Sequence, residues 1–176
     1  MRGLITDLRK VLQVIDDCEI VLDGVCIRAL VAAEDRRFFY HLGFDFIAIV
    51  RAAYMTLFLG RLQGASTIEA QLVRTVTGRR EILLSRKIRE VFVASIVSVM
   101  RPKRSIASAY LSVAYFGFEE LGILHAAARL GISLEASAKW QIFFLVAMLK
   151  RPLSTSPSVE NLQAIWRRAA WIEQNF

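Results

Sequence analysis

Cysteine and histidine are scarce in this sequence, and their scarcity excludes several kinds of site. The only cysteines are Cys18 and Cys26, which form no C-x-x-C pair and predict no disulfide framework. We expect both to be small, semi-buried side chains. The only histidines are His41 and His125, so a metal site built mainly from histidine is excluded.

Long hydrophobic runs are also missing, although 55% of the 176 residues are apolar and the mean hydropathy is +0.43. The longest stretch without a charged residue, 105–118, is shorter than the roughly 18 to 20 residues that span a bilayer. No long apolar segment follows the first basic residues, so no signal peptide is visible. We expect no transmembrane helix, and either a cytoplasmic protein or one whose anchor lies outside this sequence.

The net charge of +7 predicts a surface that attracts phosphate groups. Those groups could belong to nucleic acid, to anionic lipid or to a pyrophosphate substrate. The sequence contains no zinc-finger, RNP or basic-region pattern, and its apolar content favours a membrane over nucleic acid. Its length predicts one domain over residues 1–176, long enough to bury a core.

The spacing of apolar residues predicts an all-α domain with no convincing strand. Ser66 and Glu69 form the pattern of a capping box, which would begin a helix that ends near Thr77. The expected helices cover residues 4–15, 25–39, 46–60, 66–77, 86–100, 103–116, 121–130, 137–149 and 159–174.

The helix expected over 46–60 is strongly apolar, and two interpretations stay open. Most helices of this composition belong to a core. Alternatively, the helix inserts into the outer part of a bilayer, with Arg51 and Arg61 reaching the headgroups.

A carboxylate follows an apolar stretch at Glu34, at the start of a polar segment that contains Asp35, His41, Gly43 and Asp45. A carboxylate in partly apolar surroundings can act as a general base. The alternative is an ordinary charged helix end in contact with solvent. The compact polar turn after Glu34 favours a shaped cleft.

A second carboxylate, Glu90, shares a helix face with Arg86 and Lys87. These residues form either an ordinary surface salt-bridge cluster or a clamp for a pyrophosphate group. In the second case Glu90 orients the clamp or helps to hold a divalent metal ion. Gln71 and Arg74 project from the first turns of the expected capped helix, whose positive end favours an anion.

Together these segments resemble the motifs of the peptidoglycan glycosyltransferases, glycosyltransferase family 51, in order and spacing over roughly residues 25–152. The first motif, E-D-x-x-F-x-x-H-x-G-x-D, is matched in full from Glu34 to Asp45. The second, G-x-S-T-I-x-Q-Q-L, appears from Gly64 to Leu72, and the third, R-K-x-x-E, from Arg86 to Glu90. The fourth, K-x-x-I-x-x-x-Y-L-N with a later glycine, is met by Lys103, Ile106, Tyr110, Leu111 and Gly117.

The resemblance implies a lysozyme-like helical fold with a small apolar jaw that contacts the membrane. The implied substrate is lipid II, a disaccharide-pentapeptide on undecaprenyl pyrophosphate, which is added to a growing glycan strand. The implied location is the extracytoplasmic face of the inner membrane, as a membrane-associated protein with cell-wall synthesis proteins as further partners and no nucleic acid. No organic cofactor is expected, and a divalent cation (Mg or Mn) is compatible with the site.

The resemblance also assigns roles to residues. Glu34 would deprotonate the acceptor sugar, and Glu90 would be the second catalytic carboxylate and the metal ligand, if a metal is used. The substrate-binding side chains would be Asp35, His41, Ser66, Thr67, Gln71, Arg74, Arg86 and Lys87.

Departures from the motifs leave two other hypotheses. Ala70, Ser112 and Gln141 replace a Gln, an Asn and a Glu of the family, and motivate a catalytically weakened relative that binds lipid II or a cell-wall synthesis partner. A glycan-cleaving enzyme is the other hypothesis, because two carboxylates on a lysozyme-like fold can also hydrolyse sugars. The basic third motif argues against it, since hydrolysis needs no pyrophosphate site.

Overall fold

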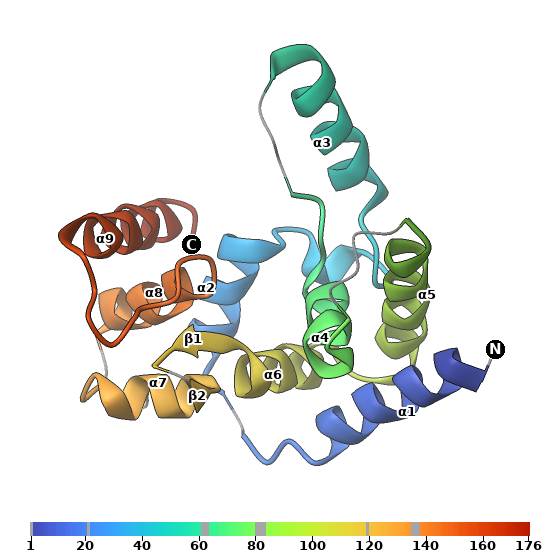
Figure 1. Cartoon of the computed structure of the whole chain (residues 1–176), viewed down its shortest axis with the longest axis horizontal. Coiled ribbons are helices and arrows are strands. Elements are labelled where there is room, and N and C mark those ends of the chain that lie inside the picture. Colours follow the sequence, from blue (N-terminus) through green and yellow to red (C-terminus); the bar gives the residue numbers. More distant parts are fainter. Residues whose placement is uncertain (1, 21, 61–63, 80–83, 119, 135–137) are drawn as a thin grey trace.

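The computed structural model describes residues 2–20, 22–60, 64–79, 84–118, 120–134 and 138–176 (Figure 1). Helices dominate these residues, and the all-α prediction is confirmed. The helices are α1 (Arg2–Asp16), α2 (Gly24–Glu34), α3 (Phe46–Leu59), α4 (Ile68–Thr77), α5 (Leu84–Met100), α6 (Lys103–Val113), α7 (Ile123–Arg129), α8 (Lys139–Met148) and α9 (Val159–Gln174), with a 3-10 turn, η1 (Phe38–Tyr40).

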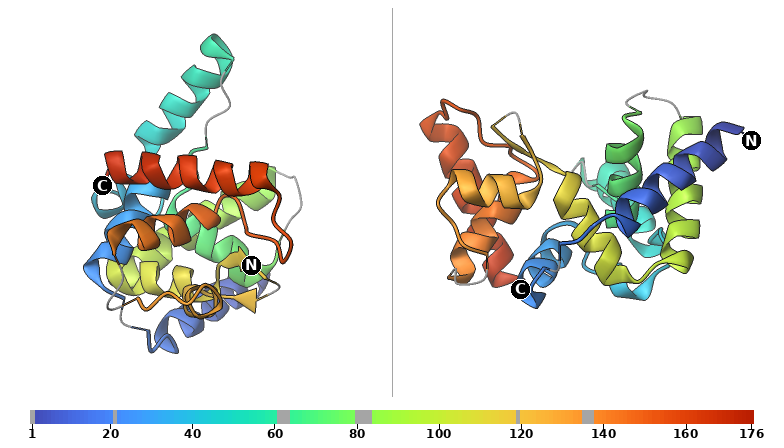
Figure 2. Two further views of the ribbon diagram at one scale, coloured as in Figure 1. Left: turned by 90° about the vertical axis from the view of Figure 1, so that its left-hand side faces the viewer. Right: turned by 90° about the horizontal axis from the view of Figure 1, so that it is seen from below.

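The core is built around α6 and α8. Every residue of α8 from Ile142 to Met148 is buried, and so are the residues of α6 from Ile106 to Leu111. Helix α2 packs on both, α9 covers α8, and α1 lies across α4, α5 and α6. Figures 1 and 2 show α7, α8 and α9 at one end of the molecule and α1, α4 and α5 at the other.

One short antiparallel strand pair was not predicted: β1 (Tyr115–Gly117) with β2 (Glu120–Leu121). The helix expected over 103–116 therefore ends at Val113. The cause is a contact distant in sequence, because Leu153 donates its N–H to the Phe116 carbonyl (3.0 Å) and accepts from the Phe118 N–H (3.2 Å). Gly117 has φ +113°, and a Cβ there would lie 1.8 Å from the Leu153 oxygen, so only glycine allows this approach.

Helix α2 also ends earlier than predicted, at Glu34 rather than residue 39. Asp35 leaves the helical conformation (φ −157°), and its side chain accepts a hydrogen bond from the Ile68 N–H at 3.2 Å. The early end makes Glu34 the last residue of α2.

The capping box predicted at the start of α4 is wrong. The N-cap is Thr67, whose Oγ1 accepts from the Ala70 N–H at 3.3 Å. Glu69 does not turn back to the cap, because its fully buried carboxylate forms an ion pair with Lys103 of α6. Two side chains, Thr67 and Asp35, thus satisfy two of the first N–H groups of α4.

Helix α3 projects from the body of the molecule (Figures 1 and 2). Asp45 caps its first turn by accepting from the Ala48 N–H at 3.0 Å, and Ala52 is its buried residue. The interpretation of this helix as core is therefore wrong. No helix within the described residues is long and apolar enough to cross a membrane. The exposed large side chains of α3 are Phe46, Ile47, Ile49, Val50, Tyr54, Leu57, Phe58 and Leu59.

Candidate active site

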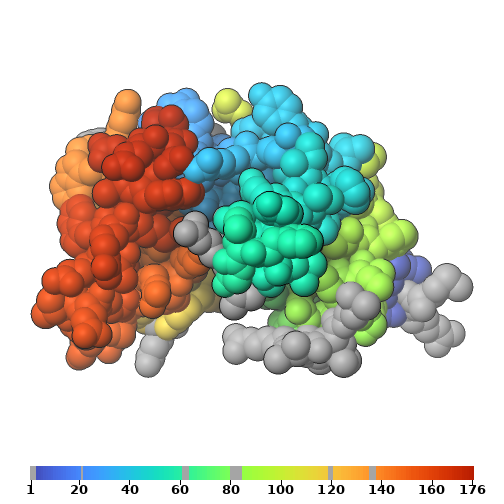
Figure 3. Space-filling view, turned by 90° about the horizontal axis from the view of Figure 1, so that it is seen from above, coloured from blue at the N-terminus to red at the C-terminus, as the bar shows by residue number. Residues whose placement is uncertain are grey.

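A cleft of about 540 Å³ opens between the end of α2, the segment that leads into α4, the base of α3 and the inner face of α9. Figure 3 looks down on this face of the molecule, with α9 in red on one side and α3 in teal on the other. Among the predicted site residues, Glu34, Asp35, Ser66, Thr67 and Gln71 line the cleft.

Glu34 is held from two sides. Its Oε1 lies 2.6 Å from Nη2 of Arg168, and its Oε2 accepts from Nε2 of Gln71 at 3.1 Å. The Arg168 guanidinium also donates to the Ala33 carbonyl at 3.0 Å. The side chain of Glu34 keeps 15% of its surface exposed, so the carboxylate is fixed in position yet reachable from the cleft.

Arg168 is the residue that sequence analysis missed. The sequence contained a pattern that could have indicated it. Arg168 lies three residues after Ile165 and four before Ile172, and both isoleucines are fully buried on the inner face of α9. An arginine beside the buried face of an amphipathic helix needs a polar partner.

The orientation of Gln71 is fixed by Tyr110 of α6, whose hydroxyl donates to Oε1 of Gln71 at 2.7 Å. The amide nitrogen of Gln71 is then left to donate to Glu34. Burial raises the pKa of Tyr110, and the charge of Glu34 raises it further, so the phenol stays a donor.

The predicted phosphate clamp lies beyond α4 and outside the lining of the cleft. Arg74, one turn after Gln71, donates to Oγ of Ser66 at 3.3 Å, at the cleft. Partial burial lowers the pKa of Lys87; Glu90 opposes this shift, while Arg74 and Arg86 contribute to it. Arg74 therefore contacts the cleft wall and lies near enough to Lys87 for its charge to affect the pKa of that side chain.

Glu90 is almost fully buried and forms an ion pair with Arg86 one turn earlier. Its second oxygen, Oε2, has no hydrogen-bond partner among the described residues. The pair gives Arg86 a fixed position on the face of α5 that carries Lys87.

Three predicted substrate-binding residues have structural partners. Both carboxylate oxygens of Asp35 contact Nε2 of His41, at 3.0 and 3.1 Å. Thr67 donates through Oγ1 to the Gly43 carbonyl at 2.8 Å. Gly43 has φ +81°, and a Cβ there would lie 2.4 Å from the Ala94 carbonyl, so the turn requires glycine. These contacts join the first two motifs into one framework around Glu34.

Comparison with known proteins gives a family match over the residues that form this cleft. The transglycosylase family model matches residues 20–176. The chain belongs to this family. It is 34% identical to penicillin-binding protein 1A of Rickettsia typhi over 155 residues, which cover 85% of this chain and 20% of the relative.

Two further relatives show similar identity and coverage. Penicillin-binding protein 1A of Aquifex aeolicus is 37% identical over 150 residues, covering 81% of this chain and 20% of that protein. The Escherichia coli protein of the same name is 35% identical over 144 residues, covering 81% and 17%. The transglycosylase chain thus spans about a fifth of the length of these relatives.

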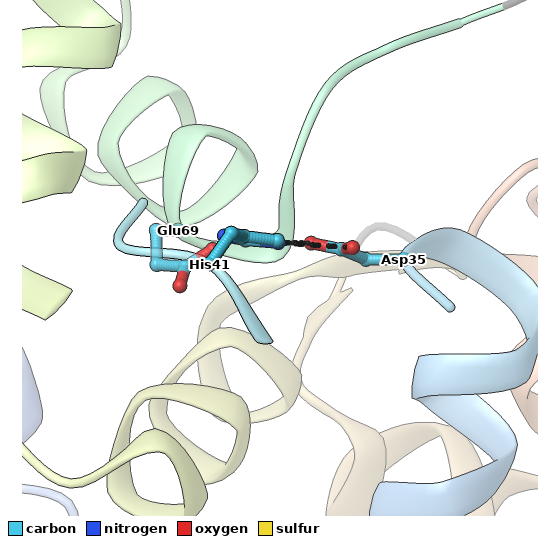
Figure 4. Close-up of side chains that lie close together, drawn as sticks. All are labelled: Asp35, His41 and Glu69. Carbon is cyan, nitrogen blue, oxygen red and sulfur yellow. Dashed lines mark hydrogen bonds and ion pairs between the residues drawn. The ribbon is translucent and has the colours of Figure 1, made fainter. Parts of the chain in front are cut away.

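Within the described residues of this transglycosylase, one group could hold a metal ion: Asp35, His41 and Glu69, whose ligand atoms lie within 4.8 Å of one another. Figure 4 shows the His41 ring with Asp35 on one side and Glu69 on the other. The group does not fit a Mg or Mn ion that contacts a pyrophosphate. Asp35 and Glu69 are buried, and Lys103 already supplies a positive charge to Glu69.

Several basic side chains line the transglycosylase cleft. Arg37 is paired with Asp45 at 3.2 Å, and Arg36 stacks over Trp171 of α9 at 5.0 Å. Arg51 and Lys150 also line the cleft, and neither has a carboxylate partner in the described part of the chain. The Glu34 carboxylate therefore faces a space that favours an anionic substrate.

Proposed function

We propose that this transglycosylase domain is a peptidoglycan glycosyltransferase, which joins lipid II units into glycan strands by inverting transfer and releases undecaprenyl pyrophosphate. The observation that carries the proposal is the Glu34 carboxylate, fixed by Arg168 and Gln71 at the wall of a basic cleft. A general base must be positioned and reachable, and Glu34 is both.

In the proposed reaction, Glu34 takes the proton of the acceptor sugar 4-hydroxyl as its oxygen attacks the anomeric carbon of the growing strand. The bond from that carbon to the pyrophosphate oxygen breaks. Arg74 and Lys87 stabilise the negative charge that develops on the leaving group, and Arg86 contributes from its pair with Glu90. Fixed cations of this kind need no reorganisation as the charge appears.

Glu90 has a positioning role in this proposal, because it holds Arg86. Arg86 and Lys87 surround Glu90 with positive charge, which disfavours a divalent cation at that carboxylate. No step of the proposed reaction uses a metal ion. Ser66, Thr67 and Gln71 would contact the sugar or phosphate from the cleft wall, while Asp35 and His41 would maintain its shape.

The exposed face of α3 supports the membrane part of the proposal. Leu57 and Phe58 are 77% and 72% exposed, at the end of the helix that projects furthest from the body. Large apolar side chains gathered on one exposed element are typical of a surface that binds lipid or protein. We propose that α3 is the membrane-contacting jaw of a lysozyme-like domain, which would work at the extracytoplasmic face of the inner membrane, near cell-wall synthesis proteins.

The weakened-relative hypothesis has less support. Ala70 is buried, Ser112 donates to the Ala109 carbonyl of its own helix at 2.8 Å, and Gln141 accepts from the Ala138 N–H at 3.0 Å. None of the three residues lines the 540 Å³ cleft. The side chains of Ser112 and Gln141 thus make contacts local in the sequence.

The deciding experiment gives the purified protein labelled lipid II in detergent and separates the products on a gel. We expect polymeric glycan. Binding of lipid II without polymer would favour the weakened relative instead. Release of soluble fragments from purified peptidoglycan would favour the glycan-cleaving enzyme and overturn the proposal.

A further inference from the structure

A second groove, of about 420 Å³, lies along α9. It adjoins the cleft, because Lys150, Arg168 and Trp171 line both. The groove lies between α9 and the residues that follow α8. It therefore follows a wall whose residues lie outside the four motifs named above.

One face of α9 forms the floor of this groove. Ala164, Arg167, Arg168 and Trp171 lie at helical spacing on that face, and the small side chain of Ala164 leaves room above it. Beyond it, a third hollow of about 530 Å³ near the start of α9 is lined by Arg151 and Arg167 but also by Glu160. An extended anionic ligand that reached the cleft would thus follow α9 as far as Arg151 and Arg167.

The groove is lined by cations, and none of the described residues that line it is acidic. Lys150, Arg151 and Arg167 have no carboxylate partner within the described ranges, and all three are exposed. Arg89, by contrast, is paired with Asp7 at 2.8 Å. An unpaired row of cations attracts a ligand that carries several negative charges.

We propose that this groove binds the carboxylates of the peptide chains carried by the glycan strand; this rests on the proposed function. Lipid II brings a peptide with each disaccharide, so a strand held at Glu34 presents peptide carboxylates at regular intervals beside the cleft. Arg151 and Arg167 can each bind a carboxylate through two parallel hydrogen bonds. Trp171 adds an aromatic surface where groove and cleft meet.

The test measures binding of soluble glycan strands, with and without their peptides, to the full chain carrying Glu34→Gln. We expect Arg151→Glu with Arg167→Glu to weaken binding of peptide-bearing strands about tenfold, because two attractive charges become repulsive. Binding of strands from which the peptides have been removed should change less than about twofold. Inorganic pyrophosphate is the third probe, since it shares the negative charge but not the carboxylates.

The matched control is Arg9→Glu with Lys10→Glu, the same charge change on exposed residues of α1 at the other end of the molecule. Arg151→Gln with Arg167→Gln tests the same groove without charge reversal and should give a smaller loss. The inference is overturned if the control weakens binding equally, if stripped strands lose as much as intact ones, or if pyrophosphate competes fully. A wild-type protein that binds intact strands through the groove but makes no polymer refutes the proposed function and leaves this inference standing.

Discussion

Arg168 of α9 forms an ion pair with Glu34 of α2, with 2.6 Å between Nη2 and Oε1, although 134 positions separate them in the chain. Arg36, two residues after Glu34, also holds the C-terminal end of α9. It donates to Oδ1 of Asn175 at 2.5 Å and stacks on Trp171. Helix α9 is therefore a wall of the cleft and supplies the partner of the proposed base.

Replacing Arg168 by Gln should lower the rate of lipid II polymerisation by about 10- to 100-fold, less than loss of the base itself. The ion pair that holds the Glu34 carboxylate at the cleft wall is lost, so the base is positioned less well. Gel assays of polymer formation measure the rate, with Arg9→Gln on α1 as the control. An unchanged rate in Arg168→Gln would show that Arg168 does not position Glu34.

The buried pair of Glu69 and Lys103 predicts a large effect on stability. Replacing Lys103 by Met leaves a buried carboxylate without its partner and should lower the free energy of unfolding by about 3–5 kcal/mol. Adding Glu69→Gln should restore much of this loss, because no buried charge then remains. Urea denaturation of the single and double variants measures both changes.

The stability of the Lys103→Met variant should also depend on pH. Burial raises the pKa of Glu69, so the folded state holds a proton at pH values where the unfolded state has released it. Stability is then retained at low pH and lost as the pH rises through the folded-state pKa. The deficit of the variant should be larger at pH 8 than at pH 5, and an equal deficit at both would contradict this account.

Helices whose bounds depend on the spacing of their own apolar residues were predicted correctly from the sequence. The expected helix 159–174 coincides with α9, and the expected helix 4–15 lies within α1, because their apolar residues recur at helical spacing. The end of α2 depends instead on Asp35, which bonds to Ile68, 33 positions away. No local pattern contains that contact.

The candidate site was predicted only in part, because several of its contacts join residues that are distant in the sequence. Glu34, Gln71 and Arg74 were predicted from the sequence as site residues, and the fold brings the first two into contact and Arg74 to Ser66. The pairing of Glu69 with Lys103 rather than with its own helix end required knowledge of where α6 lies. Arg168 was missed because its partner lies at the opposite end of the chain.

Lys87 offers a prediction about proton uptake. Partial burial lowers the pKa of Lys87, and a pyrophosphate bound beside it should raise that pKa again. Binding of undecaprenyl pyrophosphate at alkaline pH should therefore take up protons. Calorimetry in two buffers of different ionisation enthalpy measures the uptake, which Lys87→Met should remove and Lys10→Met should leave unchanged. Equal uptake in the Lys87 variant would place the pyrophosphate elsewhere.

The exposed end of α3 predicts binding to lipid. Leu57→Asp with Phe58→Asp should weaken binding to anionic phospholipid vesicles by about tenfold or more, because burial of each side chain is worth about 1.5–3 kcal/mol. Leu124→Asp is the control, since this side chain is also exposed but lies on α7. Sedimentation with vesicles measures the bound fraction. Equal losses in both variants would refute a specific role of α3.

The most direct test of the central claim compares wild type and Glu34→Gln with lipid II, measuring binding and polymer formation separately. The amide keeps the size of the side chain but cannot accept the proton of the acceptor hydroxyl. We expect lipid II binding within about threefold of wild type and polymer formation reduced by about 10² to 10⁴. Polymer formation at the wild-type rate would show that Glu34 is not the base and would contradict the account.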